Sequence, residues 1–151
     1  MNASPNKNYL GKLAIVLHAH LPYVRKNEKN SLEEDWLFQA IMECYIPLLQ
    51  VMESSKKEDP SNTKLTLSLS PTLLSLFQNK QIQKTFPSWI QTRIDFLNNL
   101  PNKEKVASEF LMRNIKNSYL YWEKCSGNLI ERFKNLNITG NLDILTCAAT
   151  H

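Results

Sequence analysis

The residues best suited to chemistry in this chain are its histidines. His18 and His20 stand one residue apart in the stretch VLHAHLPYVR, His151 ends the printed sequence, and the chain has 3 histidines in all. Such imidazoles have three common uses: they make ordinary core or loop contacts, they hold a divalent zinc or manganese ion, or they hydrogen-bond the hydroxyls of a sugar. Residue type and spacing leave all three uses open.

A strand is the element expected to position the first two histidines. The run Leu13 to Leu17 in KLAIVLHAH follows Gly11, is too short for a helix and contains no polar residue. This predicts a strand buried on both faces, as in a parallel sheet. Because side chains alternate across a strand, His18 and His20 are expected to point to the same side.

Two further strands are predicted along the chain. The stretch LTLSLS alternates at period two, and Pro71 predicts an end at Ser70, because proline cannot extend a central ladder. A third strand is predicted over residues 142–148, after a turn at Gly140. Ligands of parallel α/β folds bind beyond the carboxyl ends of the strands. His151 follows the third predicted strand, so we expect it at the same rim of the sheet as His18 and His20.

A helix is predicted over the stretch SLEEDWLFQAIMECYIPLLQVME. Ser31 and Glu34 have the spacing of a capping box, and the neighbouring charges of Glu33 and Asp35 suit the positive end of a helix dipole. Pro47 lacks an amide hydrogen and is expected to kink this helix or end its first half. One apolar stripe is predicted from helical spacing: Leu37, Ile41, Cys44, Tyr45, Leu48 and Met52.

Trp36 has two interpretations on this helix. A tryptophan on an amphipathic helix usually belongs to the core, and the alternative is an aromatic platform near the sugar site that the histidines would form. Pro22 and Tyr23 are expected to shape the loop after the first strand.

Alternation of strands and helices predicts an α/β fold. Residues 79–138 carry apolar residues at helical spacing and predict two or three helices, broken near Pro87, Pro101 and Gly127. Three β/α units are too few to close a barrel, and the chain stops directly after a strand. We therefore expect part of a larger domain, with residues 1–10 as a disordered lead.

Composition excludes several classes of function. The 18 basic and 14 acidic residues give a net charge of +4 without a basic block, which argues against nucleic-acid binding. Apolar runs fall far short of the roughly 20 residues of a membrane helix. The amino terminus is polar, and the three cysteines are widely spaced without a Cys-x-x-Cys pair, so a reducing cytoplasm is expected.

Four segments in order, VLHAHLPYV, EEDWLFQAIMECYIPLL, LTLSLSPTLL and GNLDILTCAATH, resemble the N-terminal portion of glycoside hydrolase family 57. The resemblance is greatest to its 1,4-α-glucan branching enzymes. It implies that residues 1–151 are the first β/α units of a distorted seven-stranded (β/α) barrel, the truncated catalytic domain of a retaining enzyme. The implied partner is an α-1,4-glucan, without metal or other cofactor.

The resemblance also implies roles for individual residues. His18, His20 and His151 match histidines that line the donor sugar site in the family. Trp36 is added to them as a substrate-binding residue on its interpretation as an aromatic platform, not on a family motif. Asp143 and Gln39 stand where the family commonly has Glu, which puts the local polar network in doubt. The catalytic nucleophile and acid/base lie in later motifs, so both are expected after residue 151 and the isolated chain is expected to be inert.

Alternatives remain at this point. The parent activity could be that of a 4-α-glucanotransferase or an α-amylase of the same family. From a different class, the chain could be a complete small metal-dependent hydrolase that uses His18, His20 and His151. It could also be a non-catalytic carbohydrate-binding remnant.

Overall fold

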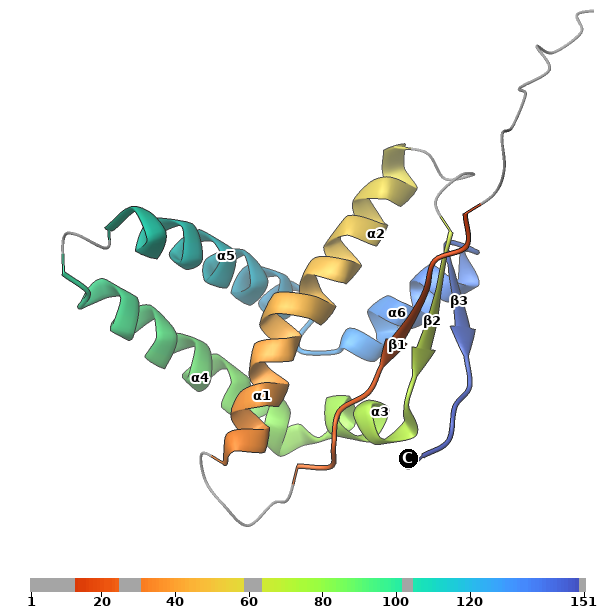
Figure 1. Cartoon of the computed structure of the whole chain (residues 1–151), viewed down its shortest axis with the longest axis horizontal. Coiled ribbons are helices and arrows are strands. Elements are labelled where there is room, and N and C mark those ends of the chain that lie inside the picture. The colour runs from red at the N-terminus through yellow and green to blue at the C-terminus, as the bar shows by residue number, and fades with distance from the viewer. Residues whose placement is uncertain (1–12, 25–30, 59–63, 102–104, 150–151) are drawn as a thin grey trace, which may run out of the picture.

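A computed structural model describes residues 13–24, 31–58, 64–101 and 105–149. Three parallel strands form one sheet in the order β1-β2-β3: β1 Val16–Ala19, β2 Leu65–Leu69 and β3 Leu142–Leu145. Helices fill the two connections, as Figure 1 shows. The predicted α/β alternation and the parallel sheet are therefore confirmed, although β3 ends earlier than residue 148. The expected lead over residues 1–10 lies outside the described residues.

The two faces of the sheet differ in chemistry. Leu65, Leu67 and Leu69 of β2 are buried in the core on one face. The alternate positions of β2, Thr66 and Ser68, lie on the other face. The register pairs Leu17 with Leu67 and His18 with Ser68, so β1 places its histidine on the hydroxyl-bearing face. This face is called the polar face below.

The prediction that the first strand is buried on both faces is wrong for the described residues. Val16 is 61% exposed and Leu17 is 38% exposed, and the strand begins at Val16 rather than Leu13. The cause is its position, because β1 is an outer strand of this sheet and β2 is the central one. The unbroken apolar run predicts a strand, but it does not show which strands lie on either side of it.

One long helical segment follows β1, comprising α1 Leu32–Ala40, the π-helical turn η1 Ile41–Tyr45 and α2 Ile46–Glu58. The hydroxyl of Ser31 accepts a hydrogen bond from the Glu34 amide (3.2 Å), which confirms the Ser31 half of the predicted capping box. Of the predicted stripe, four residues are buried and Leu48 is partly buried; the buried ones are Leu37, Ile41, Tyr45 and Met52. Three further buried residues were not predicted: Phe38, Ile46 and Leu49. Cys44, expected in the stripe, is exposed. The π turn is wider than an α turn, so it shifts the stripe by one residue.

The same π turn accommodates Pro47, which does not end the helix. The amide of Ile46 bonds to the carbonyl of Ile41, five residues back, and Pro47 has no amide hydrogen to donate. The carbonyl of Met42 instead accepts a hydrogen bond from the buried Ser118 hydroxyl of α5 (2.9 Å). A side chain from another helix thus occupies the acceptor beside the proline.

Four more helices complete the described fold: α3 Pro71–Gln78, α4 Lys80–Asn98, α5 Lys105–Lys124 and α6 Leu129–Ile138. Breaks near Pro101 and Gly127 are confirmed, but Pro87 lies inside α4. The fully buried Phe86 and Ile90 on either side of Pro87 offset the roughly 3 kcal/mol cost of an interior proline. Within the described residues, no helix is both long and apolar enough to cross a bilayer.

Candidate functional site at the strand ends

His18 and His20 lie together at the carboxyl end of β1. His18 belongs to the strand and His20 follows directly after it. Their rings are nearly parallel, with 7° between the ring planes and 6.0 Å between centroids. The predicted orientation to one side is therefore confirmed. His18 is exposed and His20 is partly buried, so the pair borders a surface rather than filling a core.

Ser68 orients the His18 ring. Its Oγ lies 3.2 Å from Nδ1 of His18, and the two residues are register partners on neighbouring strands. Ser68 is only 8% exposed, so the ring meets a hydroxyl held by buried backbone. Ser68 was not among the residues predicted from the sequence. The signal was the alternation in LTLSLS, which sends its hydroxyls to the face opposite the leucines.

The carboxyl end of β2 is held by Ser70 and Thr72. Ser70 is fully buried, its amide donates to the Ala19 carbonyl of β1 (3.1 Å), and its hydroxyl caps α3. Thr72 Oγ1 donates to the Ala149 carbonyl (2.6 Å), which returns the segment after β3 to the end of β2. His151 lies outside the described residues, so its place at this rim stays a prediction.

Trp36 is 49% exposed, and the expectation that it belongs to the core is wrong. The buried side of α1 is formed by Leu37 and Phe38. Successive residues are turned by about 100° around a helix, which points Trp36 away from them. Figure 1 shows that α1 begins at the end of the molecule toward which the strands run. The alternative, that Trp36 contacts a sugar, stays a prediction.

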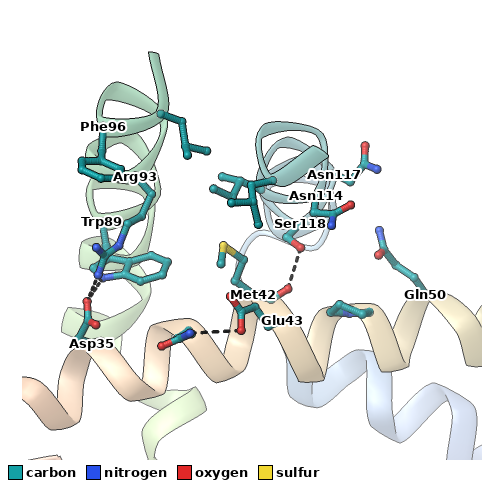
Figure 2. A pocket seen from close by; sticks show the side chains of 15 residues that line it. Asp35, Met42, Glu43, Gln50, Trp89, Arg93, Phe96, Asn114, Asn117 and Ser118 are labelled. Carbon is teal, nitrogen blue, oxygen red and sulfur yellow. Dashed lines mark hydrogen bonds and ion pairs between the residues drawn. The ribbon is translucent and has the colours of Figure 1, made fainter. Parts of the chain in front are cut away.

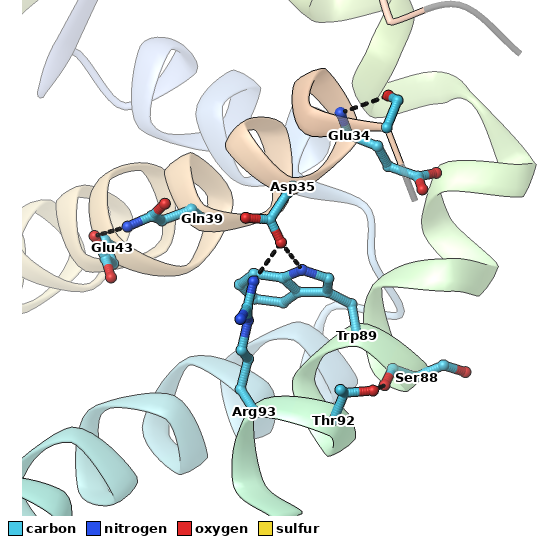
Figure 3. A network of polar contacts seen from close by, with 9 residues as sticks. Glu34, Asp35, Gln39, Glu43, Ser88, Trp89, Thr92 and Arg93 are labelled. Carbon is cyan, nitrogen blue, oxygen red and sulfur yellow. Dashed lines mark hydrogen bonds and ion pairs between the residues drawn. The ribbon is translucent and has the colours of Figure 1, made fainter. Parts of the chain in front are cut away.

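Asp35 has a larger role than the helix-end charge predicted for it. Its carboxylate accepts hydrogen bonds from Trp89 Nε1 (2.7 Å) and from the Arg93 guanidinium, both on α4 (Figure 3). The guanidinium carbon of Arg93 also lies 4.8 Å from the centre of the Trp89 ring. This network joins the first turn of α1 to α4, and sequence spacing carried no signal of it because the partners are more than 50 residues apart.

The two positions that depart from the family pattern have distinct surroundings. Gln39 donates to the carboxylate of Glu43 (3.3 Å) on the same helical segment. Asp143 of β3 is exposed and is paired in register with Thr66, which places it on the polar face. Among the residues that the structure describes, no group of three or more His, Cys, Asp or Glu side chains could hold a metal ion.

One family model matches most of this chain. The profile of glycosyl hydrolase family 57 matches residues 14–151. The chain is 33% identical over 147 residues to the 1,4-alpha-glucan branching enzyme TK1436 of Thermococcus kodakarensis, with 93% of this chain and 21% of that protein covered.

Solved structures agree in fold. A branching enzyme from Pyrococcus horikoshii superposes with a TM-score of 0.85 at 33% identity, with 93% of this chain and 27% of that chain covered. The α-amylase AmyC from Thermotoga maritima gives a TM-score of 0.80 at 34% identity and covers 93% of this chain and 28% of its own. The chain thus spans about a quarter of the length of these relatives.

Proposed function

Because the chain belongs to glycoside hydrolase family 57, we propose that it forms the first β/α units of a seven-stranded catalytic barrel acting on α-1,4-glucan. The branching reaction, in which an α-1,4 link is cleaved and an α-1,6 branch is formed, is the activity we assign to the whole domain. Two branching enzymes among the relatives support it. Residues 1–151 would be the N-terminal part of that domain.

The observation that carries the proposal is the oriented histidine pair. His18 and His20 stand with parallel rings at the carboxyl end of β1, and Ser68 engages one nitrogen of His18. Neutral imidazoles both donate and accept hydrogen bonds, so a fixed pair can select the directions of sugar hydroxyls. In this proposal the pair contacts the donor sugar, with His151 and the exposed ring of Trp36 beside it.

The reacting groups would come from outside these residues. Retaining glycoside chemistry needs two carboxyl groups about 5 Å apart, one as nucleophile and one as acid/base. On the polar face of the described sheet, Asp143 is the only carboxylate. The chain would therefore position the donor sugar, while carboxylates that follow residue 151 in the longer protein break the α-1,4 bond and activate the acceptor 6-hydroxyl.

The α-amylase relative keeps hydrolysis as the second candidate. Branching and hydrolysis share the glycosyl-enzyme intermediate and differ in whether a glucan hydroxyl or water attacks it. A 4-α-glucanotransferase would use a glucan 4-hydroxyl in the same step.

All three cysteines are free thiols, which supports a reducing cytoplasm as the place of action.

A chimera tests the proposal. Residues 14–151 replace the matching N-terminal segment of the Thermococcus kodakarensis branching enzyme, and products from amylose are followed by iodine staining and debranching analysis. We expect α-1,6 branches from the chimera and none from the 151-residue chain alone.

Histidine variants of the same chimera test the pocket. His18→Ala or His151→Ala should lower turnover by about 10- to 100-fold through loss of donor positioning, with the fold retained by circular dichroism. Branches made by the 151-residue chain alone would contradict the placement of the carboxylates. Unchanged turnover in both variants would contradict the histidine assignment.

A further inference from the structure

A groove of about 780 Å³ lies on the helical side of the molecule (Figure 2). Its floor is the helical segment α1–η1–α2, and its walls are α4 and α5. Side chains of all these helices line it, and Figure 2 shows Trp89 and Arg93 on one side of α5 and Asn114, Asn117 and Gln50 on its other side. None of the strand-end residues described above lines this groove, and its size is within the usual range of small-molecule sites.

Polar groups in the groove suit an uncharged ligand. Gln50 on the floor and Asn114 and Asn117 on α5 present amides, which both donate and accept hydrogen bonds. The carboxylate of Asp35 is already neutralised by Arg93, and that of Glu43 is hydrogen-bonded to Gln39. One uncompensated negative charge, that of Glu43, therefore remains in the groove, which disfavours phosphates, and the amides suit a neutral, hydroxyl-rich molecule.

One aromatic ring is available for the apolar face of a sugar. Phe96 of α4 lines the groove and is 63% exposed. Trp89 lines the same wall, but Arg93 covers its ring and Asp35 binds its indole nitrogen, so it stiffens the wall instead. The lining thus combines one exposed ring on α4 with amides on α5 and α2, which supply apolar contact and hydroxyl recognition at different places along the groove.

The floor has the length and stiffness for a chain of several sugars. Asp35, Gln39, Glu43, Pro47 and Gln50 line it along one side of the continuous helical segment. At 1.5 Å per residue this side extends for roughly 20 Å. The Ser118 hydroxyl bound to the Met42 carbonyl holds α5 against the π turn at mid-floor.

We propose that this groove binds a segment of α-1,4-glucan remote from the bond that reacts. The inference rests on the proposed function for its ligand class. The floor starts at Asp35, adjacent to the exposed Trp36, in the first turn of α1 at the strand-end side of the molecule. A polymer held at the strand ends would extend along the helices and gain affinity from the second contact without chemistry there.

Oligosaccharides of two lengths test the groove in the 151-residue chain. Dissociation constants for maltotriose and maltoheptaose are measured by calorimetry for the unmodified chain, Phe96→Ala and Asn114→Ala. We expect each variant to weaken maltoheptaose binding by about five-fold and to leave maltotriose unchanged. Phe110→Ala is the matched control, because Phe110 is an exposed ring of α5 outside the groove, and it should change neither constant.

The outcomes separate this inference from the proposed function. If His18→Ala weakens both sugars while Phe96→Ala and Asn114→Ala change nothing, the groove assignment is overturned and the strand-end site stands. Equal weakening of both sugars by the groove variants also overturns it. If the unmodified chain binds neither sugar, the proposed function fails and the groove assignment falls with it. Circular dichroism of each variant identifies a loss of fold, and the second groove variant then decides.

Discussion

In the helical part of the molecule, Glu53 of α2 accepts hydrogen bonds from Tyr121 of α5 (2.8 Å) and Arg132 of α6 (2.8 Å). In the sheet, a side-chain contact between neighbouring strands joins His18 Nδ1 and Ser68 Oγ, at 3.2 Å. The first set joins three helices through a partly buried ion pair. The second is a weaker contact that aims a ring. The charge-assisted hydrogen bonds of Glu53 hold the helices together, whereas the neutral contact of Ser68 orients the His18 ring.

Burial differs between the two regions in the same direction. Phe86, Leu37 and Ile41 of the helices are fully buried, whereas Val16 of β1 and Leu145 of β3 are largely exposed at the outer strands. Stability of the described residues therefore resides mainly in the helical layer. The sheet supplies the polar positions suited to a ligand, on strands whose outer edges have no neighbour among the described residues.

The largest expected effect is on the helical core. Phe86→Ala should lower the free energy of unfolding by about 4 kcal/mol, because Phe86 is fully buried and its ring packs 4.4 Å from that of Trp122 and 5.6 Å from that of Phe38. Val16→Ala is the comparison in the sheet and should cost under about 0.5 kcal/mol. Urea unfolding measures both. Equal losses would contradict the placement of stability in the helices.

A pH effect of intermediate size is expected in the same layer. Burial, with a smaller contribution from Cys44, raises the pKa of Tyr45 from 10.0 to about 12. Above pH 10 the unfolded chain releases this proton while the folded chain keeps it, so stability is complete below pH 10 and falls as pH rises toward 12. The loss should reach about 2 kcal/mol.

Tyr45→Phe should flatten this fall in unfolding free energy between pH 10 and pH 12. Tyr23→Phe is the matched control, because Tyr23 is an exposed residue after β1 and its hydroxyl is not in the core. A decline of the same size in the Tyr45→Phe variant would show that other groups cause it.

In the sheet, a smaller and local effect is expected from Ser68→Ala. The hydroxyl aims the His18 ring, so its removal should weaken maltotriose binding by about three-fold, while the free energy of unfolding changes by less than about 1 kcal/mol. Nitrogen NMR of the His18 ring should report a changed tautomer balance. A loss of affinity without any change at that ring would assign Ser68 a different role.

The smallest expected effect is that of metal. Sugar binding by neutral imidazoles needs no ion, so protein purified without chelator should contain no stoichiometric zinc or manganese, and EDTA should leave glucan binding unchanged. Elemental analysis measures the first and calorimetry the second. One tightly bound ion per chain, lost in His18→Ala, would favour the hydrolase that uses His18, His20 and His151.

The candidate site was predictable in part. Strand periodicity placed His18 and His20 on one side, because alternation is a property of the backbone alone. Ser68 was missed because its meeting with His18 depends on which strands pair and in what register. The two interpretations of Trp36, core residue or aromatic platform, could not be separated from its helix, because its exposure depends on which side of α1 faces the other helices.

By itself the sequence determined the elements whose causes are local: the Ser31 cap, the leucine alternation of β2 and the helix breaks near Pro101 and Gly127. It also determined the family, through motifs spread along the chain. Only the tertiary structure decided the rest. The π turn moved Cys44 to the surface, burial around Phe86 carried α4 through Pro87, and Asp35 found Trp89 and Arg93 on another helix. Backbone preferences act over a few residues, whereas burial and pairing depend on segments that meet only when the chain has folded.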